Sequence, residues 1–177
     1  FIAFLKSVKF EAKDTTADLP AGHPPIESTP LPAGHPEISS ASTAATTTAV
    51  SSDGKPKWTV PAGWKGIPGG QFLVAKFTIG EGSATAVNVS MSAGDGGGLL
   101  ANVNRWRGQL GQSPWSETEL QAQAKDIPLA DGQATLVEMS GKDARTGQAA
   151  TVVGAIVPRS GQTWFYKLMG DATTVES

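Results

Sequence analysis

The residues best suited to metal chemistry in this sequence are its two histidines. His23 and His35 stand twelve residues apart, and each lies in the sequence Pro-Ala-Gly-His-Pro. Imidazole nitrogens bind copper and zinc, and proline beside each Gly-His would restrict the backbone and preorganise a ligand. A zinc site normally uses three or four protein ligands, and the chain contains no cysteine to complete one. The pair is therefore a candidate metal site, and the alternative is a spacer or recognition repeat.

No other pattern in the sequence predicts catalysis. There is no Gly-x-Ser-x-Gly nucleophile elbow, and both histidines precede the part of the chain with a globular pattern. Without cysteine, disulfides, thiolate metal sites and cysteine nucleophiles are excluded. The run GDGGG at residues 94–98 precedes two leucines, whereas a phosphate-binding loop has Lys followed by Ser or Thr there. We therefore expect a protein that is not an enzyme and needs no cofactor.

Charge and hydropathy narrow the range of partners. The net charge is −2, with 14 basic and 16 acidic residues, so no basic footprint for nucleic acid is indicated. No run of 18 apolar residues is present, and we expect no membrane span. The low share of charged residues, 17%, and a Ser/Thr/Ala-rich segment favour an exported protein, either periplasmic or extracellular. Because the chain begins with Phe rather than Met, we interpret it as a processed or excised fragment.

The chain divides into three zones, residues 1–10, 11–56 and 57–177. The middle zone contains a twelve-residue unit twice, LPAGHPPIESTP and LPAGHPEISSAS, followed by the small polar run TAATTTAVSSDG. Proline favours extended backbone, and so little apolar bulk cannot form a core. This zone is predicted to be an extended Pro/Ser/Thr/Ala-rich tether.

The first zone, FIAFLKSVKF, predicts a short amphipathic helix that turns into a strand towards its end. We refer to residues 1–10 as the decapeptide. Its apolar residues recur at helical spacing along one face, and a helix this short is marginal in water unless it packs on a surface. Its candidate contact residues are Phe1, Ile2, Phe4, Leu5, Val8 and Phe10.

The third zone carries the pattern of an α+β domain. In residues 84–92, Val87, Val89 and Met91 alternate with polar residues, as expected for a strand with one buried face. Further expected strands are a short one within residues 57–64 and longer ones at 71–79, 134–140, 149–158 and 163–169. The turns Asp131-Gly132 and Ser160-Gly161 would connect the last three.

Helices are expected at three places in this zone. Residues 99–110 (LLANVNRWRGQL) have apolar residues at helical spacing, and Gly111 is a suitable end. Ser116 followed by Glu119 forms a capping box for a second helix over residues 116–125. A third helix begins near Asp171. Trp115, in the loop between the first two helices, is a candidate contact residue because exposed aromatic side chains often mark interfaces.

The two ends of the sequence fit together as one helix. Read tail to head, ATTVES followed by FIAFLKSVKF gives a single amphipathic pattern leading into a strand. Without the decapeptide, the sheet would expose an apolar face. Three alternatives remain open: the decapeptide docks on a neighbouring copy, it completes the preceding unit of a tandem array, or it folds back on its own domain. Head-to-tail contacts of the first kind generate rings or filaments.

The order of elements, together with the segments WTVPAGW, ANVNRWRGQLG, PAGHPP and AFLKSVKF, resembles uncharacterised exported bacterial proteins with a PsbP-like domain. The resemblance implies an antiparallel sheet flanked by helices and brings no enzymatic activity. We therefore expect a structural subunit that assembles with copies of itself, in a filament or repeat array. The alternative is a monomeric periplasmic or surface-attached binding domain, metal-linked through His23 and His35.

Overall fold

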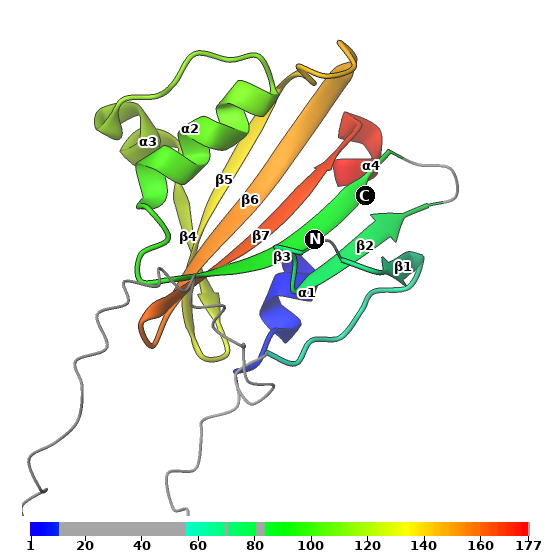
Figure 1. Ribbon diagram of the computed structural model, residues 1–177, viewed down its shortest axis with the longest axis vertical. Coiled ribbons are helices and arrows are strands. Elements are labelled where there is room, and N and C mark those ends of the chain that lie inside the picture. Colours follow the sequence, from blue (N-terminus) through cyan, green and yellow to red (C-terminus); the bar gives the residue numbers. More distant parts are fainter. Residues whose placement is uncertain (11–55, 70, 81–83, 177) are drawn as a thin grey trace, which may run out of the picture. The chain divides into compact units, whose positions relative to one another are not determined.

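The computed structural model describes residues 1–10, 56–69, 71–80 and 84–176 of the chain (Figure 1). The decapeptide and residues 56–177 belong to one compact unit. Of the predicted tether, all but Pro56 lies outside the described residues, and so do His23 and His35.

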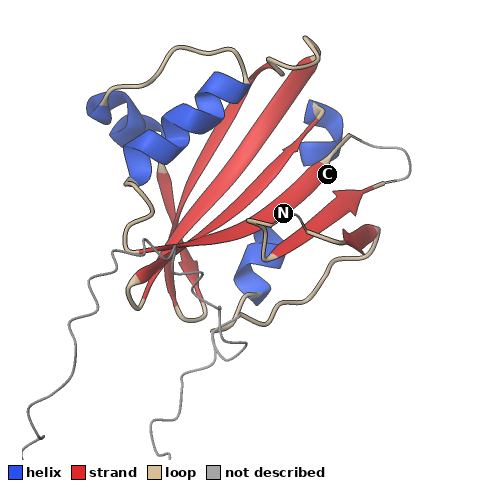
Figure 2. Cartoon of the chain, viewed as in Figure 1, coloured by secondary structure: helices blue, strands red, loops and turns tan. Residues whose placement is uncertain are grey.

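One antiparallel sheet of seven strands dominates this unit (Figure 2). Its strands run in the spatial order β1-β2-β3-β7-β6-β5-β4, so the chain crosses from β3 to the far edge and then returns by three hairpins. The strands are β1 (Trp64–Ile67), β2 (Ala75–Ile79), β3 (Ala86–Ala93), β4 (Lys125–Leu129), β5 (Gly132–Lys142), β6 (Ala149–Arg159) and β7 (Gln162–Gly170). The predicted class, α+β with an antiparallel sheet flanked by helices, is confirmed.

Helices cover both faces of the sheet. They are α1 (Ile2–Ser7), α2 (Leu99–Gln109), α3 (Glu117–Gln123) and α4 (Ala172–Glu176). On one face, buried residues of α1 and of the strands form a cluster that we call the α1 core, and Val175 of α4 packs against it. On the other face, residues of α2, α3 and the strands form the α2 core. Because side chains alternate along each strand, the same strands serve both clusters.

Several features that were predicted from short stretches of the sequence are present in the structure. Val87 and Val89 are fully buried in the α1 core. The Ser116 hydroxyl accepts a hydrogen bond from the Glu119 backbone N–H, and the Glu119 carboxylate accepts one from the Ser116 backbone N–H, which completes the capping box. Asp171 accepts a hydrogen bond from the Thr174 backbone N–H at 2.9 Å and so caps α4.

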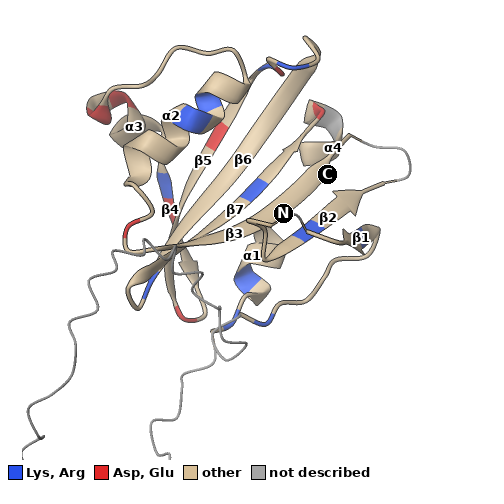
Figure 3. Cartoon of the chain, in the orientation of Figure 1, with Lys and Arg blue, Asp and Glu red and all other residues tan. Residues whose placement is uncertain are grey.

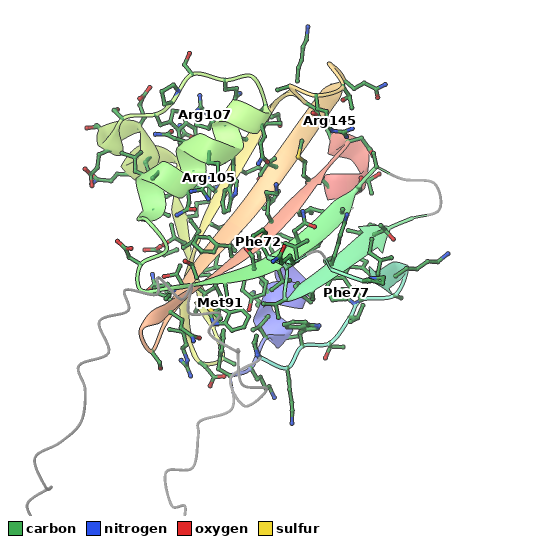
Figure 4. The ribbon with its side chains drawn as sticks, viewed as in Figure 1. Phe72, Phe77, Met91, Arg105, Arg107 and Arg145 are labelled. Atoms are coloured by element: carbon green, nitrogen blue, oxygen red, sulfur yellow. The ribbon has the colours of Figure 1, made fainter. Side chains whose placement is uncertain are left out.

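Other predictions about this zone are wrong. The strand expected near the start of residues 57–64 is reduced to a single bridge at Lys57, and β1 begins only at Trp64. Phe72 precedes β2 and is 84% exposed (Figure 4), because the strand starts at Ala75. The edge strand β4 was not expected. Its Pro128 is tolerated because an edge strand leaves some N–H positions without a ladder partner.

Candidate functional site

The decapeptide forms a short helix whose ends are held by backbone hydrogen bonds. The Leu5 N–H donates to the Phe1 carbonyl and the Val8 N–H to the Leu5 carbonyl, each at 3.1 Å. The Ser7 hydroxyl donates to the Phe4 carbonyl at 2.7 Å. No side chain caps the first turn. A helix of only six residues is not stable by itself in water, so α1 depends on its packing.

Phe4 lies at the centre of an aromatic cage. Its side chain is 1% exposed. Its ring centroid lies 5.0 Å from that of Trp64, with three more rings at 5.8–6.2 Å, those of Trp58, Phe77 and Tyr166. Tilted and edge-on pairs at these separations add to the stabilisation that burial provides. The predicted contact at Phe4 is therefore the principal anchor of the decapeptide.

Leu5 and Val8 complete the buried side of the helix. Leu5 is fully buried and Val8 is 1% exposed, and both belong to the α1 core. Ile2 points away from this core and is 44% exposed, while Phe1 is half-buried. Burial of Phe1 lowers the pKa of its amino group below the ordinary value. Of the predicted apolar contacts in the helix, only Ile2 lies largely outside the interface.

The end of the decapeptide is fixed by polar contacts to the β4–β5 turn. The Phe10 backbone N–H donates to the Asp131 carboxylate at 3.0 Å. The guanidinium of Arg159 lies 5.1 Å from the centroid of the Phe10 ring and donates a hydrogen bond to the Asp131 carbonyl. The Phe10 ring meets Trp164 edge-on at 5.6 Å. The position of this segment is therefore set by directed contacts as well as by apolar burial.

A short antiparallel bridge joins the decapeptide to the chain that follows the tether. Lys9 and Lys57 exchange two backbone hydrogen bonds of 2.8 Å. The Ser7 hydroxyl also accepts a hydrogen bond from the Thr59 backbone N–H at 2.9 Å. Residues on either side of the undescribed segment 11–55 thus lie side by side, in agreement with the strand-like ending predicted for the decapeptide.

Trp115 lies on the other face of the sheet and is not part of this site. It is half-buried against the α2 core. The Asn104 amide donates to its carbonyl and accepts from its N–H, at 3.0 and 2.7 Å, and the Arg107 guanidinium lies 4.2 Å from its ring centroid. Figure 4 shows Arg105 and Arg107 on α2. The position of Trp115 is therefore explained by its contacts with α2.

No candidate metal centre is formed by the described residues. Within them, no group of three or more His, Cys, Asp or Glu side chains is placed to hold an ion, and the two histidines lie outside these ranges. None of the described helices is long and apolar enough to cross a membrane. The site that the structure brings together is therefore the surface that receives the decapeptide.

The decapeptide is predicted by the sequence, but the surface that receives it is not. Trp58, Trp64 and Asp131 hold it, and they come from two separate parts of the chain, the segment 58–64 and the β4–β5 turn. The aromatic pair in the WTVPAGW segment was visible in the sequence, but nothing there linked it to residues 1–10. Only the register of the sheet and the bridge at Lys57 bring these side chains around Phe4.

Comparison with known proteins gives little further guidance. No family model matches the chain, and none of the curated proteins matches it. Among solved structures, a crystal structure from Bacteroides thetaiotaomicron VPI-5482 aligns with a TM-score of 0.41 at 12% sequence identity. The alignment covers 66% of this chain and 40% of that one, so the chain spans well under half the length of this match.

Proposed function

We propose that this protein is a non-enzymatic structural subunit that assembles head to tail with copies of itself, exchanging its decapeptide between neighbours in an extracellular filament or repeat array. We place it, on its sequence motifs, with exported bacterial proteins of the PsbP-like type. The observation that carries the proposal is the burial of Phe4, Leu5 and Val8 in the α1 core, although residues 11–55 separate them in sequence from the rest of the domain.

An exchange between copies would conserve the contacts of the decapeptide. The ring contacts of Phe4, the bridge at Lys9 and the contacts of Phe10 join the decapeptide to residues beyond the tether. The same surface can therefore receive the decapeptide of its own chain or that of a neighbour, which is the condition for domain swapping. If each copy gives its decapeptide to one neighbour and receives one from another, the contact is heterologous and can propagate along a row of subunits.

A disulfide across the Lys9–Lys57 bridge distinguishes the two modes of docking. The chain has no cysteine, so Lys9→Cys and Lys57→Cys would introduce a single pair. Residues that exchange two hydrogen bonds across antiparallel strands have Cα atoms about 5.5 Å apart, a separation that a disulfide spans. We expect oxidation of the double variant at about 1 mM protein to give covalent ladders beside internally linked monomer on non-reducing gels, and at about 1 µM to give mainly internally linked monomer.

The matched control is a pair that cannot exchange through the tether. Ser140 and Thr151 face each other across β5 and β6 with their hydroxyl oxygens 2.8 Å apart. A Ser140→Cys and Thr151→Cys variant should crosslink only internally at both concentrations. Internal crosslinks alone for the Lys9–Lys57 pair, over the whole range of concentration and on surfaces coated with the protein, would reject assembly by exchange. The protein would then be a monomeric module closed by its own decapeptide.

A further inference from the structure

A groove lies on the α2 face of the sheet, beside the part that α2 covers. It has a volume of about 620 Å³, within the range of about 300–1,000 Å³ that is usual for sites of small ligands. Figure 1 shows α2 and α3 over one side of the sheet, with β7, β3 and β2 left without a helix over them. The walls of the groove are formed by Gln109 at the end of α2 and by residues 143–146 and 148–150 of the β5–β6 hairpin.

The floor of the groove is a row of side chains across three strands. Lys76 of β2 pairs with Asn88 of β3, and Asn88 pairs with Lys167 of β7, so the three side chains project from the same face. The next residue in this row is Gly154 of β6, which lies under the ring of Trp106. The α2 core therefore ends at Gly154, and the polar row begins next to it. Figure 3 shows the basic positions of β2 and β7 in this uncovered part of the sheet.

The polar groups of the row are incompletely paired. The Lys167 ammonium donates to the Gln109 amide oxygen at 2.7 Å, and it has no carboxylate within 4 Å among the residues that the structure describes. The amide oxygen of Asn88 is buried and has no hydrogen-bond partner within the described ranges of the chain. A buried acceptor left without a partner is unfavourable, so a ligand that donates to it would recover part of that cost.

The charges around the groove favour an anion. The groove is lined by three basic side chains and two carboxylates, those of Lys76, Arg145 and Lys167 and of Asp143 and Asp171. The Arg145 guanidinium lies 3.8 Å from the Asp143 carboxylate, which partly neutralises its charge. The two lysines of the row therefore remain as the cations at the floor of the groove. Burial lowers the pKa of Lys167, with the Asp143 carboxylate acting in the opposite direction. A bound anion would offset this cost of desolvation.

We propose that this groove binds a carboxylate-bearing, polyhydroxylated ligand, a sugar acid, with its carboxylate on Lys167 and Lys76 and a hydroxyl on the Asn88 amide. A hydroxyl both donates and accepts, so it can satisfy this amide in a way that a simple inorganic anion cannot. Three small apolar parts of the lining, from Ala86, Ala150 and Met169, would contact the C–H face of a sugar ring. The free monosaccharide and a uronate unit within a polysaccharide share this chemistry.

The test measures binding to the full chain by calorimetry and by NMR of side-chain amides. The probes are D-galacturonate and its linear trimer, with D-galactose as the probe without charge and acetate as the probe without hydroxyls. We expect galacturonate or its trimer to bind with a Kd of about 1 mM or lower and to shift the Asn88 side-chain amide signals, with galactose and acetate at least about tenfold weaker. Tighter binding of the trimer would identify a polysaccharide source, and equal binding per site a free sugar acid.

Single-charge variants locate the site. Lys167→Met should weaken binding of galacturonate by at least about tenfold, which corresponds to about 1.4 kcal/mol. Lys125→Met removes the same charge from an exposed position on β4, outside the groove, and should leave the affinity within about twofold. If Lys167→Met does not fold, Lys76→Met at a half-buried position supplies the same measurement.

Three results would overturn the proposal. Galacturonate and its trimer could fail to bind at any concentration up to about 10 mM, or galactose and acetate could bind as tightly as galacturonate. The variants of Lys167 and Lys76 could bind as well as Lys125→Met. None of these outcomes depends on whether the protein assembles, because the groove and the decapeptide lie on opposite faces of the sheet.

Discussion

Replacing Phe4 by alanine is the most direct perturbation of the interface that completes the domain. The side chain is 1% exposed and touches four aromatic rings, so its removal leaves a cavity that rigid neighbours cannot easily fill. Such replacements of buried phenylalanine cost about 3–5 kcal/mol. Because domains of this size unfold with about 5–15 kcal/mol in total, we expect the midpoint of urea unfolding to fall sharply.

Tryptophan fluorescence is a suitable assay, since Trp58 and Trp64 both border the Phe4 ring. The matched control is Ile2→Ala, on the same helix but 44% exposed, for which we expect a change within about 0.5 kcal/mol. If Phe4→Ala lost less than about 1 kcal/mol, or no more than Ile2→Ala, the decapeptide would not be part of the cooperative core. The assembly proposal would then have no thermodynamic basis.

Three further predictions concern the cores on the two faces of the sheet. Gly154→Ala should lower the free energy of unfolding by about 1–3 kcal/mol in urea titrations, because a Cβ at this position overlaps the Trp106 ring. The control Gly108→Ala, in open space on α2, should be neutral or stabilising, and equal effects of the two substitutions would contradict this packing. Tyr166→Phe should leave the protein as stable or up to about 1 kcal/mol more stable, since the buried hydroxyl has no hydrogen-bond partner among the described residues, and a loss above about 1 kcal/mol would reveal one. Burial also raises the pKa of Tyr166, so the unfolded state loses the phenol proton first as the pH rises. Above about pH 10 the stability of the parent protein should therefore fall by about 1.4 kcal/mol per pH unit relative to Tyr166→Phe. Because Tyr166 is the only tyrosine, absorbance near 295 nm follows this titration directly, and a midpoint near pH 10 in the folded protein would contradict the prediction.

Those parts of the fold that depend on neighbours in sequence could be predicted. The alternation of Val87 and Val89 and the pair Ser116 and Glu119 act within a few residues, and the structure confirms both. The edge strand β4 could not be predicted, because its residues KDIPL alternate poorly and contain a proline, and only pairing with β5 makes them a strand. Tertiary pairing overrides local propensity at such an edge.

The two sites, the decapeptide interface and the groove, likewise combine signals that are local in sequence with contacts that only the fold creates. The apolar spacing of Phe4, Leu5 and Val8 is a local signal and identified one side of the interface. The other side depends on sheet register, which places Trp64 and Phe77 beside Phe4 from strands far along the chain. The polar row of the groove likewise needs register, since nothing in the sequence near Asn88 points to Lys167.

The length of the tether decides when exchange between copies can compete with closure within one chain. The composition of residues 11–55 predicts a tether without a core. If a tether of about 45 residues behaved as a flexible chain, its root-mean-square span would be about 35–40 Å. Since Lys9 and Lys57 lie side by side, such a tether presents the decapeptide to its own domain at an effective concentration of about 1 mM. Free subunits below that concentration would therefore close on themselves. Exchange becomes favourable only where neighbours are held at higher local concentration, as along a growing filament or between covalently linked repeats. Assembly by exchange would therefore depend on prior alignment of the subunits.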